Sequence, residues 1–566
     1  MHFQTLLSLG IQSLTMAAAL QIRGRQVPSA SPAVPCASLQ APTVPGATVT
    51  SIKAAEVRNF TMPNFGAPGL PGTSSPGKAA PFSFCDVNVT LTHGNDSVRI
   101  EVWLPLTGWN GRFQGTGGGG FIAGTFASAM APEVAAGYAA ASTDAGLEPM
   151  SFDGTGIQFD QQLLTNFASL SVHEMALVGK NLTQAFYGKP ASFSYWNGCS
   201  TGGRQGYMEA QQYPNDFDGI LAAAPAINWA KFVPSEMWPF VVQNSGGQFI
   251  PDCVLDMLIA NTIKACDNDD GVQDGIISNP LACKPNTTAM VNMNFDCQGS
   301  SGKVTQQHVD MFDKILAGPA SEDGTQLWFG FLPGTNTTML TRQSRPFSLA
   351  SGYFDNLVAK ANVAQSVTMT NFTGLFSSSE AQFGALLDTD NPDLTAFRNA
   401  GGKLLTWQGF SDQLIPPQGT VNYRQKVEAL MGGGANVDSF YRLFFAPGVM
   451  HCAGGNGAQP VSVLDALVNW VEKGAAPDTL PAKTFDAKTT RNLCRYPLVQ
   501  KYSGSGDVNS AASWTCVDGG VRQQQTTAGD VSSGANSGAW SRTIVRDQAL
   551  PYAVGLATLT LGLLLL

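Results

Sequence analysis

The stretch SYWNGCSTGGRQG, residues 194–206, predicts the turn around which the rest of the chain is arranged. It contains GCSTG, a G-x-S-x-G pattern centred on Ser200, between an apolar segment typical of a buried strand and a segment with helical spacing. The glycines permit a sharp strand-to-helix turn that exposes the serine hydroxyl. A bare G-x-S-x-G pattern is common, so the strand–turn–helix context carries the argument. We therefore predict that Ser200 is a nucleophile.

A serine nucleophile needs a general base, and the chain has only five histidines. One of them, His451, follows the predicted core strand at 441–450, where α/β-hydrolases place their catalytic histidine. Asp412 follows another predicted strand at 403–409. The order Ser…Asp…His is that of α/β-hydrolases and differs from the order in other serine-protease folds. The alternatives are a structural loop histidine and a turn-forming aspartate.

Strands and helices alternate from about residue 100 to 226 and again after 403, which predicts a mostly parallel sheet covered by helices. This alternation of strands and helices is absent between residues 226 and 403, where the sequence has an Asp-rich segment and many short polar runs. We therefore expect the α/β fold class, in the form of an α/β-hydrolase core that is interrupted by a large lid insertion. The expected boundaries are 20–228 for the first half of the core, 229–396 for the lid and 397–519 for the second half.

The first 19 residues are typical of a secretory signal peptide, because an apolar run ends in small residues. Their charged start is weak, and a buried N-terminal helix is the alternative. Seven N-x-S/T sequons support secretion and glycosylation. They begin at Asn59, Asn88, Asn95, Asn181, Asn286, Asn336 and Asn371.

The C-terminal segment has the three parts of a GPI-anchor signal: small residues, a polar spacer and a short apolar tail. We expect a flexible Ser/Gly/Gln-rich stalk over 520–539 and removal of 540–566, with attachment at Asn536, or at Gly534 or Ser533. A plain transmembrane tail is the alternative. The protein would then be secreted and held at the cell surface, on membrane or wall.

Net charge and cysteine content further restrict the class of protein to which the chain can belong. The net charge is −9 and no run of Lys or Arg exceeds two residues, which argues against a nucleic-acid partner. The ten cysteines are even in number and form no C-x-x-C pair, so we expect five disulfides in place of zinc or thioredoxin-type chemistry. Nothing in the sequence indicates an oligomeric state.

Two cysteines adjoin the predicted catalytic residues. Cys199 precedes Ser200, and Cys452 follows His451. A disulfide between them would hold their Cα atoms about 5.5 Å apart and bring the serine and histidine loops together. Small misplacements of catalytic groups lose rate steeply, so such a link would favour catalysis. The alternative is that the two cysteines pair elsewhere.

An oxyanion in the transition state needs two N–H donors. The amide of Thr201, directly after the serine, is one by position. The four glycines that follow the predicted strand RFQGT offer the second, and Gly118 or Gly119 is favoured because glycine lets the backbone approach a substrate closely. The alternative for this glycine run is a flexible turn.

The segment CDNDDGVQDGII in the predicted lid is a candidate calcium site, since calcium prefers hard oxygen ligands. The predicted ligands are the carboxylates of Asp267, Asp270 and Asp274 and the carbonyls of Val272 and Ile276. It is not an EF-hand, because Ser278 stands where such a loop requires glutamate. Cys266 and Cys283 flank the loop and are expected to pair around it. A solvated acidic turn is the alternative.

The motifs GCSTGG, GFSD and HC resemble the Cys-Ser–Asp–His-Cys pattern of the tannase and fungal feruloyl esterase family. The resemblance extends to WNGRFQGTGGGGF, CDNDDGVQDGII, APAINW and RYPLVQKYSGSGDVNSAASWTC, and so covers most of the mature chain. It implies an α/β-hydrolase core with a lid that binds structural Ca²⁺. It also implies Ser200 as nucleophile, His451 as base, Asp412 as its orienting acid and a bridging Cys199–Cys452 disulfide.

The resemblance implies hydrolysis of phenolic esters. We expect a serine esterase that releases ferulic or related hydroxycinnamic acids from plant polysaccharide through an acyl-enzyme. A tannase acting on galloyl esters is the first alternative, and a non-catalytic cell-wall protein is a remote one. The remaining disulfides are expected to be Cys36–Cys85, Cys253–Cys297 and Cys494–Cys516, and the last of these matches the family's C-terminal region.

Overall fold

The computed structural model describes residues 31–61, 80–147, 152–155, 157, 160–297 and 299–520. All of these belong to one compact unit that contains both the sheet and the insertion. The predicted signal peptide, the anchor signal and the stalk beyond Gly520 lie outside the described residues. Over the described ranges, no helix has the length and apolar character that a membrane crossing requires.

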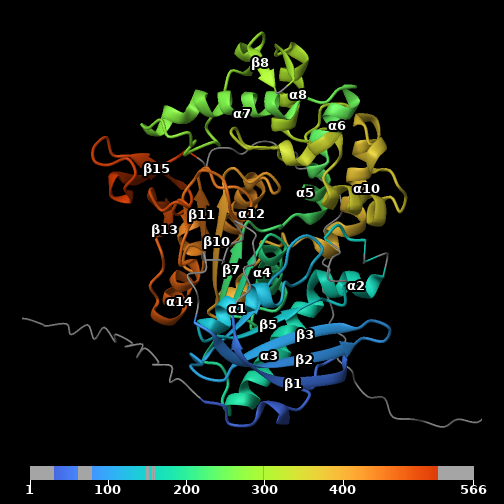
Figure 1. The fold of residues 1–566 in the computed structure, drawn as a ribbon, viewed down its shortest axis with the longest axis vertical. Coiled ribbons are helices and arrows are strands. Elements are labelled where there is room, and N and C mark those ends of the chain that lie inside the picture. The colour runs from blue at the N-terminus through green and yellow to red at the C-terminus, as the bar shows by residue number, and fades with distance from the viewer. Residues whose placement is uncertain are drawn as a thin grey trace, which may run out of the picture. The chain divides into compact units, whose positions relative to one another are not determined.

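A nine-stranded sheet forms the centre of the fold, in the order β1-β2-β3-β5-β4-β6-β7-β10-β11 (Figure 1). Its strands are β1 (Thr48–Phe60), β2 (Phe82–Thr92), β3 (Val98–Pro105), β4 (Arg112–Thr116), β5 (Ala139–Thr143), β6 (Phe193–Cys199), β7 (Gly219–Ala223), β10 (Lys403–Gly409) and β11 (Tyr441–Ala446). The six strands β5, β4, β6, β7, β10 and β11 are parallel to one another, and β1 to β3 extend the sheet antiparallel from β5. The predicted α/β fold with a mostly parallel sheet is confirmed.

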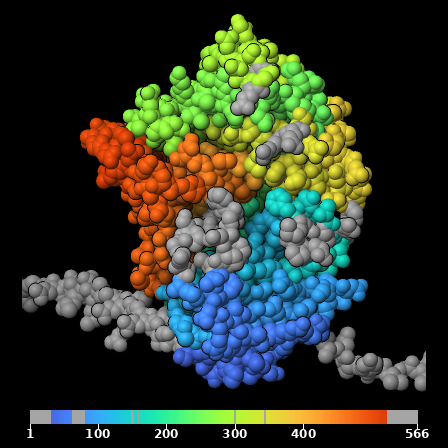
Figure 2. Space-filling model, in the orientation of Figure 1, coloured from blue at the N-terminus to red at the C-terminus, as the bar shows by residue number. Residues whose placement is uncertain are grey.

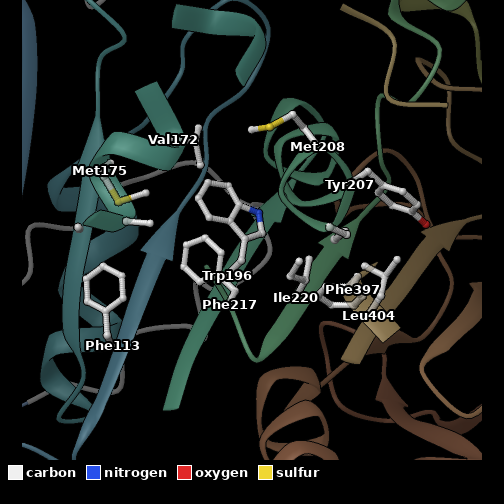
Figure 3. Close-up of a cluster of buried hydrophobic side chains, with 14 of the residues drawn as sticks. Phe113, Val172, Met175, Trp196, Tyr207, Met208, Phe217, Ile220, Phe397 and Leu404 are labelled. Atoms are coloured by element: carbon white, nitrogen blue, oxygen red, sulfur yellow. The ribbon is translucent and has the colours of Figure 1, made fainter. Parts of the chain in front are cut away.

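Helices cover both faces of the parallel part. They are α1 (Ala127–Ala135), α2 (Gln161–Thr165), α3 (Ser171–Tyr187), α4 (Thr201–Gln212), α12 (Pro417–Leu430), α13 (Gly434–Val437) and α14 (Val463–Lys473). Consecutive strand residues point to opposite faces, so Trp196 of β6 packs with α3 and α4 while Tyr195 packs with α14. Figure 3 shows Trp196 and Phe217 within the first of these layers, near Met175 of α3.

Residues 229–396 connect β7 to β10 and are mainly helical. They contain α5 (Trp229–Glu236), α6 (Trp238–Ser245), α7 (Asp252–Cys266), α8 (Gln306–Ala317), α9 (Ser348–Gly352), α10 (Met369–Leu387) and the hairpin of β8 (Asn294–Cys297) and β9 (Ser300–Lys303). The short helix α11 (Thr395–Asn399) leads back to the sheet. The apolar side chains of this insertion form a second core, which also includes Phe121 and Phe167 from the first half of the chain.

Short strands complete the C-terminal region: β12 (Gln459–Pro460), β13 (Thr479–Lys483), β14 (Thr490–Cys494), β15 (Leu498–Tyr502) and β16 (Trp514–Asp518). This region contacts the insertion directly. Arg491 Nη2 lies 3.1 Å from Asp274 Oδ2, and the Asn279 side chain donates to the carbonyl of Gly519 at 2.9 Å. Figure 2 shows the two as adjoining red and green surfaces.

All ten cysteines are paired, and the five pairs are those expected from the sequence. They are Cys36–Cys85, Cys199–Cys452, Cys253–Cys297, Cys266–Cys283 and Cys494–Cys516, with Cα–Cα distances of 5.6 to 6.0 Å. These distances lie within the usual range for a disulfide. Two of the pairs are internal to the insertion, and only Cys199–Cys452 joins the two halves of the core.

Candidate active site

Ser200 occupies the sharp turn between β6 and α4. Its backbone has φ 63° and ψ −121°, a conformation that residues other than glycine rarely adopt. The turn is held because the N–H of Ser200 donates to the carbonyl of Ala223 at 3.1 Å, and its own carbonyl accepts from the N–H of Arg204 at 2.9 Å. A Cβ on Gly198 would lie 2.6 Å from the backbone of Gly202, so the turn requires glycine there. This is the geometry of a nucleophile elbow.

The predicted acid and base are in direct contact. His451 Nδ1 lies 3.0 Å from both carboxylate oxygens of Asp412, which is fully buried. The backbone N–H groups of Leu414 and Ile415 donate to Asp412 Oδ1 at 3.0 and 2.9 Å, and the side chain of Gln408 donates to Oδ2 at 3.0 Å. These donors fix the carboxylate, which in turn fixes the orientation of the imidazole.

The disulfide brings the serine and histidine loops together. Cys199 and Cys452 have their Cα atoms 6.0 Å apart, and each is the immediate neighbour of a predicted catalytic residue. His451 Nε2, the ring nitrogen that does not face Asp412, lies 3.6 Å from Cys452 Sγ. Ser200, Asp412 and His451 therefore lie beyond the carboxyl ends of β6, β10 and β11, with Asp412 and His451 in contact and the loops of Ser200 and His451 joined by the disulfide.

The glycine run lies beside Thr201, the residue that follows the predicted nucleophile Ser200. The Thr201 hydroxyl donates to the carbonyl of Gly120 at 2.6 Å, and the Thr201 N–H has no partner inside α4 because it belongs to the first helical residue. The N–H of Gly118 donates to Gln205 Oε1 at 3.3 Å, and that of Gly119 donates to the carbonyl of Ile122 at 3.0 Å. Each glycine would have to release this bond to bind an oxyanion, so the second donor stays a prediction.

Three residues that support the site were not found from the sequence. Gln408 is fully buried and is held by Thr420, whose hydroxyl donates to its Oε1 at 2.7 Å. Gln413 Oε1 accepts from the backbone N–H of His451 at 3.0 Å, while its Nε2 lies 3.3 Å from Met339 Sδ of the insertion. The only indication in the sequence that Gln413 supports the site is its position directly after Asp412.

The third supporting residue is Arg204, in the first turn of α4. Its guanidinium is fully buried and donates to the carbonyls of Phe167, Ala168 and Leu387 at 2.7, 3.0 and 3.2 Å. Burial lowers its pKa to about 10. Arg204 thus ties the end of α10 in the insertion to α4, the helix that begins directly after Ser200, with no carboxylate among these hydrogen-bond partners.

The predicted calcium loop is folded around its own carboxylates. Asp267 Oδ1 accepts from the N–H groups of Asp274, Gly275 and Ile276 at 3.1, 2.8 and 3.2 Å. Burial raises the pKa of Asp274, and the neighbouring carboxylate of Asp270 raises it further. The guanidinium of Arg491, whose Nη2 lies 3.1 Å from Asp274 Oδ2, opposes this rise, so a cationic side chain already faces the carboxylate. In the part of the chain described here, no three carboxylate, imidazole or thiol groups converge tightly enough to hold a metal. Calcium therefore stays a prediction.

Residues 85–517 match the profile of a family described as "Tannase and feruloyl esterase". A probable feruloyl esterase of Arthroderma benhamiae is 44% identical over 507 residues, covering 85% of this chain and 93% of the relative. The crystal structure of feruloyl esterase B from Aspergillus oryzae superposes with a TM-score of 0.74 at 27% identity, covering 84% of this chain and 97% of the other. Tannin acyl hydrolase from Aspergillus niger gives 0.74 at 25% identity, covering 84% and 93%. The chain therefore belongs to the tannase and feruloyl esterase family and is a carboxylic ester hydrolase.

Proposed function

We propose that the protein is a secreted serine esterase that releases ferulic or related hydroxycinnamic acids from esters of plant cell-wall polysaccharide. One observation carries this proposal: the Cys199–Cys452 disulfide joins two loops. One loop contains Ser200, and the other contains His451, which is bound to Asp412. The substrate class is taken from relatives named probable feruloyl esterases, of which one is 44% identical to this chain.

The geometry supports a two-step mechanism. His451 Nε2 removes the hydroxyl proton as Ser200 Oγ attacks the ester carbonyl, and Asp412 keeps the other ring nitrogen protonated. The Thr201 N–H stabilises the oxyanion of the tetrahedral intermediate. The imidazolium then gives its proton to the leaving alcohol, and an acyl-enzyme remains on Ser200. Water, activated by His451, attacks this ester and releases the phenolic acid.

Initial rates on methyl ferulate, methyl caffeate and methyl gallate test the substrate class. We expect kcat/KM for the better of the two hydroxycinnamates to exceed that for the gallate by about 10-fold or more, a difference typical of a pocket fitted to one ligand shape. A preference for methyl gallate would instead favour the tannase alternative. Absence of turnover on all three esters would contradict the proposal.

We further propose that the loop from Asp267 to Ile276 binds Ca²⁺ and stabilises the insertion. Chelation should lower Tm, because calcium at about 100 times its Kd would contribute about 2.7 kcal/mol to the folded state. Differential scanning calorimetry with and without EGTA, together with metal analysis, measures this. Asp274→Asn should abolish the response to EGTA, whereas Asp486→Asn, on an exposed turn, should retain it. A calcium-free protein whose Tm is insensitive to EGTA would contradict the proposal.

Secretion and surface anchoring are also proposals, and they rest on the seven sequons and the two terminal signals. The mature protein in its native host should then lack both terminal segments and be released from the cell surface by a phosphatidylinositol-specific phospholipase. Retention of the apolar C-terminal tail on the mature chain would contradict the anchor.

A further inference from the structure

The loop that carries His451 connects β11 to β12 and comprises residues 447–458; it is called the histidine loop below. Its two arms are joined because the N–H of Gly457 donates to the carbonyl of Gly448 at 3.0 Å. Gly448 has a φ of 68°, in the left-handed region that favours glycine. Gly448 and Val449 therefore form the arm of the loop that leads from the sheet to His451.

The same arm also contacts the loop of the predicted catalytic acid. The N–H of Ser411, the residue before Asp412, donates to the carbonyl of Val449 at 3.0 Å. A Cβ on Gly409 would collide with that carbonyl oxygen, so the two backbones are in close contact there. The side chain of Val449 is fully buried. A displacement of this arm would therefore change the geometry of the base and of the acid that orients it.

Ile276, the last residue of the predicted calcium loop, packs on this arm from the insertion. A Cβ on Gly448 would lie 3.1 Å from Ile276 Cγ1, so the isoleucine side chain occupies the space that glycine leaves beside its backbone. A cavity of about 20 Å³ lies between the two loops, lined by Ile276 on one side and by Pro447 and Ala458 on the other. A volume of this size holds about one water molecule. The insertion and the histidine loop are thus closely packed at this point.

Two carboxylates hold the backbone of Ile276 in place. Its N–H donates to Asp267 Oδ1 at 3.2 Å and to Asp274 Oδ1 at 3.1 Å. Asp274 forms an ion pair with Arg491 of β14, and the Arg491 guanidinium lies 4.0 Å from the centre of the Trp514 ring. The predicted calcium loop is therefore fixed to the C-terminal region, and it presents Ile276 to the histidine loop from a supported backbone.

We propose that Ile276 is a positioning residue for His451. Its side chain supports the arm of the histidine loop that leads to the imidazole, and it thereby couples the predicted calcium loop of the insertion to the geometry of the base. Small displacements of catalytic groups cost rate steeply, whereas binding of the ester in the ground state depends less on the position of the base. Loss of this side chain should therefore lower kcat and leave KM nearly unchanged. The inference rests on the proposed esterase function and adds a residue to the support of its base.

Ile276→Ala tests the contact, because alanine keeps the N–H that the two carboxylates bind and the carbonyl that is a predicted calcium ligand. Ile276 is half-buried, so the variant should fold. In excess calcium chloride and well below Tm, we expect kcat for methyl ferulate to fall about 10-fold, with KM within about 2-fold of the wild type. Ile276→Val, which retains a β-branched side chain, should recover most of the loss.

A second measurement reports the base without an ester substrate. Phenylmethylsulfonyl fluoride reacts with Ser200 Oγ, which replaces fluoride on the sulfur while His451 takes the hydroxyl proton. The inactivation rate of Ile276→Ala should therefore fall by a factor similar to that in kcat.

Ile277→Ala is the matched control. Ile277 is buried and packs inside the insertion against the Cys266–Cys283 disulfide, away from the contact with Gly448. Its replacement should lower Tm by leaving a cavity, yet keep kcat and the inactivation rate within about 2-fold of the wild type. A wild-type kcat in Ile276→Ala, an equal loss of kcat in both alanine variants, or a rise in KM alone would overturn the positioning role. Wild-type enzyme that hydrolyses no ester would instead contradict the esterase function itself.

Discussion

Ser200→Ala is expected to lower kcat/KM for methyl ferulate by about 10⁴-fold or more while leaving Tm close to the wild-type value. The substitution removes the atom that forms the acyl-enzyme, and losses of this size follow removal of a triad nucleophile. Alanine has the same Cβ as serine, so the strained φ of 63° at this turn imposes the same backbone demand on both residues. Steady-state kinetics and a thermal melt measure the two quantities.

Ser503→Ala provides the matched control. Ser503 is exposed in the C-terminal region and adjoins β15, so its replacement should change neither kcat/KM nor Tm. Residual activity above about 1% in the Ser200 variant, with contamination by wild-type enzyme excluded by mass spectrometry, would reject Ser200 as the nucleophile.

Removal of the Cys199–Cys452 disulfide by the double substitution Cys199→Ala/Cys452→Ala should lower kcat by about 100-fold. Without the link, the loops of Ser200 and His451 are free to separate, and a misplacement of about 1 Å costs about that much in rate. Loss of the cross-link should also lower the free energy of unfolding by about 2–5 kcal/mol. Kinetics at a temperature well below the Tm of the variant separate the two effects.

The insertion offers a control that also lacks one disulfide. Cys253–Cys297 has the same Cα–Cα distance of 6.0 Å but joins two segments of the insertion. Cys253→Ala/Cys297→Ala should lower stability and leave kcat within about 2-fold of the wild type. If the two double variants lost kcat equally, the Cys199–Cys452 bond would have no specific role in positioning the catalytic residues.

The parts of the site that the sequence predicted are those marked by short motifs. Ser200 lies in a G-x-S-x-G turn, and Cys199 and Cys452 are the sequence neighbours of the predicted catalytic residues Ser200 and His451. Gln408 and Arg204 act through contacts between segments far apart in sequence, and no local pattern reveals such contacts. Likewise, the glycine run suggested free N–H donors, but the partners of Gly118 and Gly119 became visible only in the folded chain.

The fold was predicted where the hydrophobic pattern was regular. The parallel strands read as short apolar runs between helices, whereas residues 25–80 are rich in Pro, Gly, Ala and Ser, a composition that predicts irregular structure. The structure instead forms the 13-residue strand β1 there. Its pairing with β2 shifts register after Val49 and again after Val57, so exposed and half-buried positions do not alternate regularly along it. An edge strand of this kind has no period-2 signal for sequence analysis to detect.

The Cys199–Cys452 bond spans 253 residues, and all four cysteines of the insertion lie between its two ends. During biosynthesis Cys199 therefore leaves the ribosome together with four competing thiols before Cys452 has been made. Any early pairing of Cys199 has to be undone by thiol–disulfide exchange. The Cys199–Cys452 bond can therefore form only late in synthesis and folding, after Cys452 has been made. Heterologous production consequently calls for an oxidising compartment that contains a disulfide isomerase.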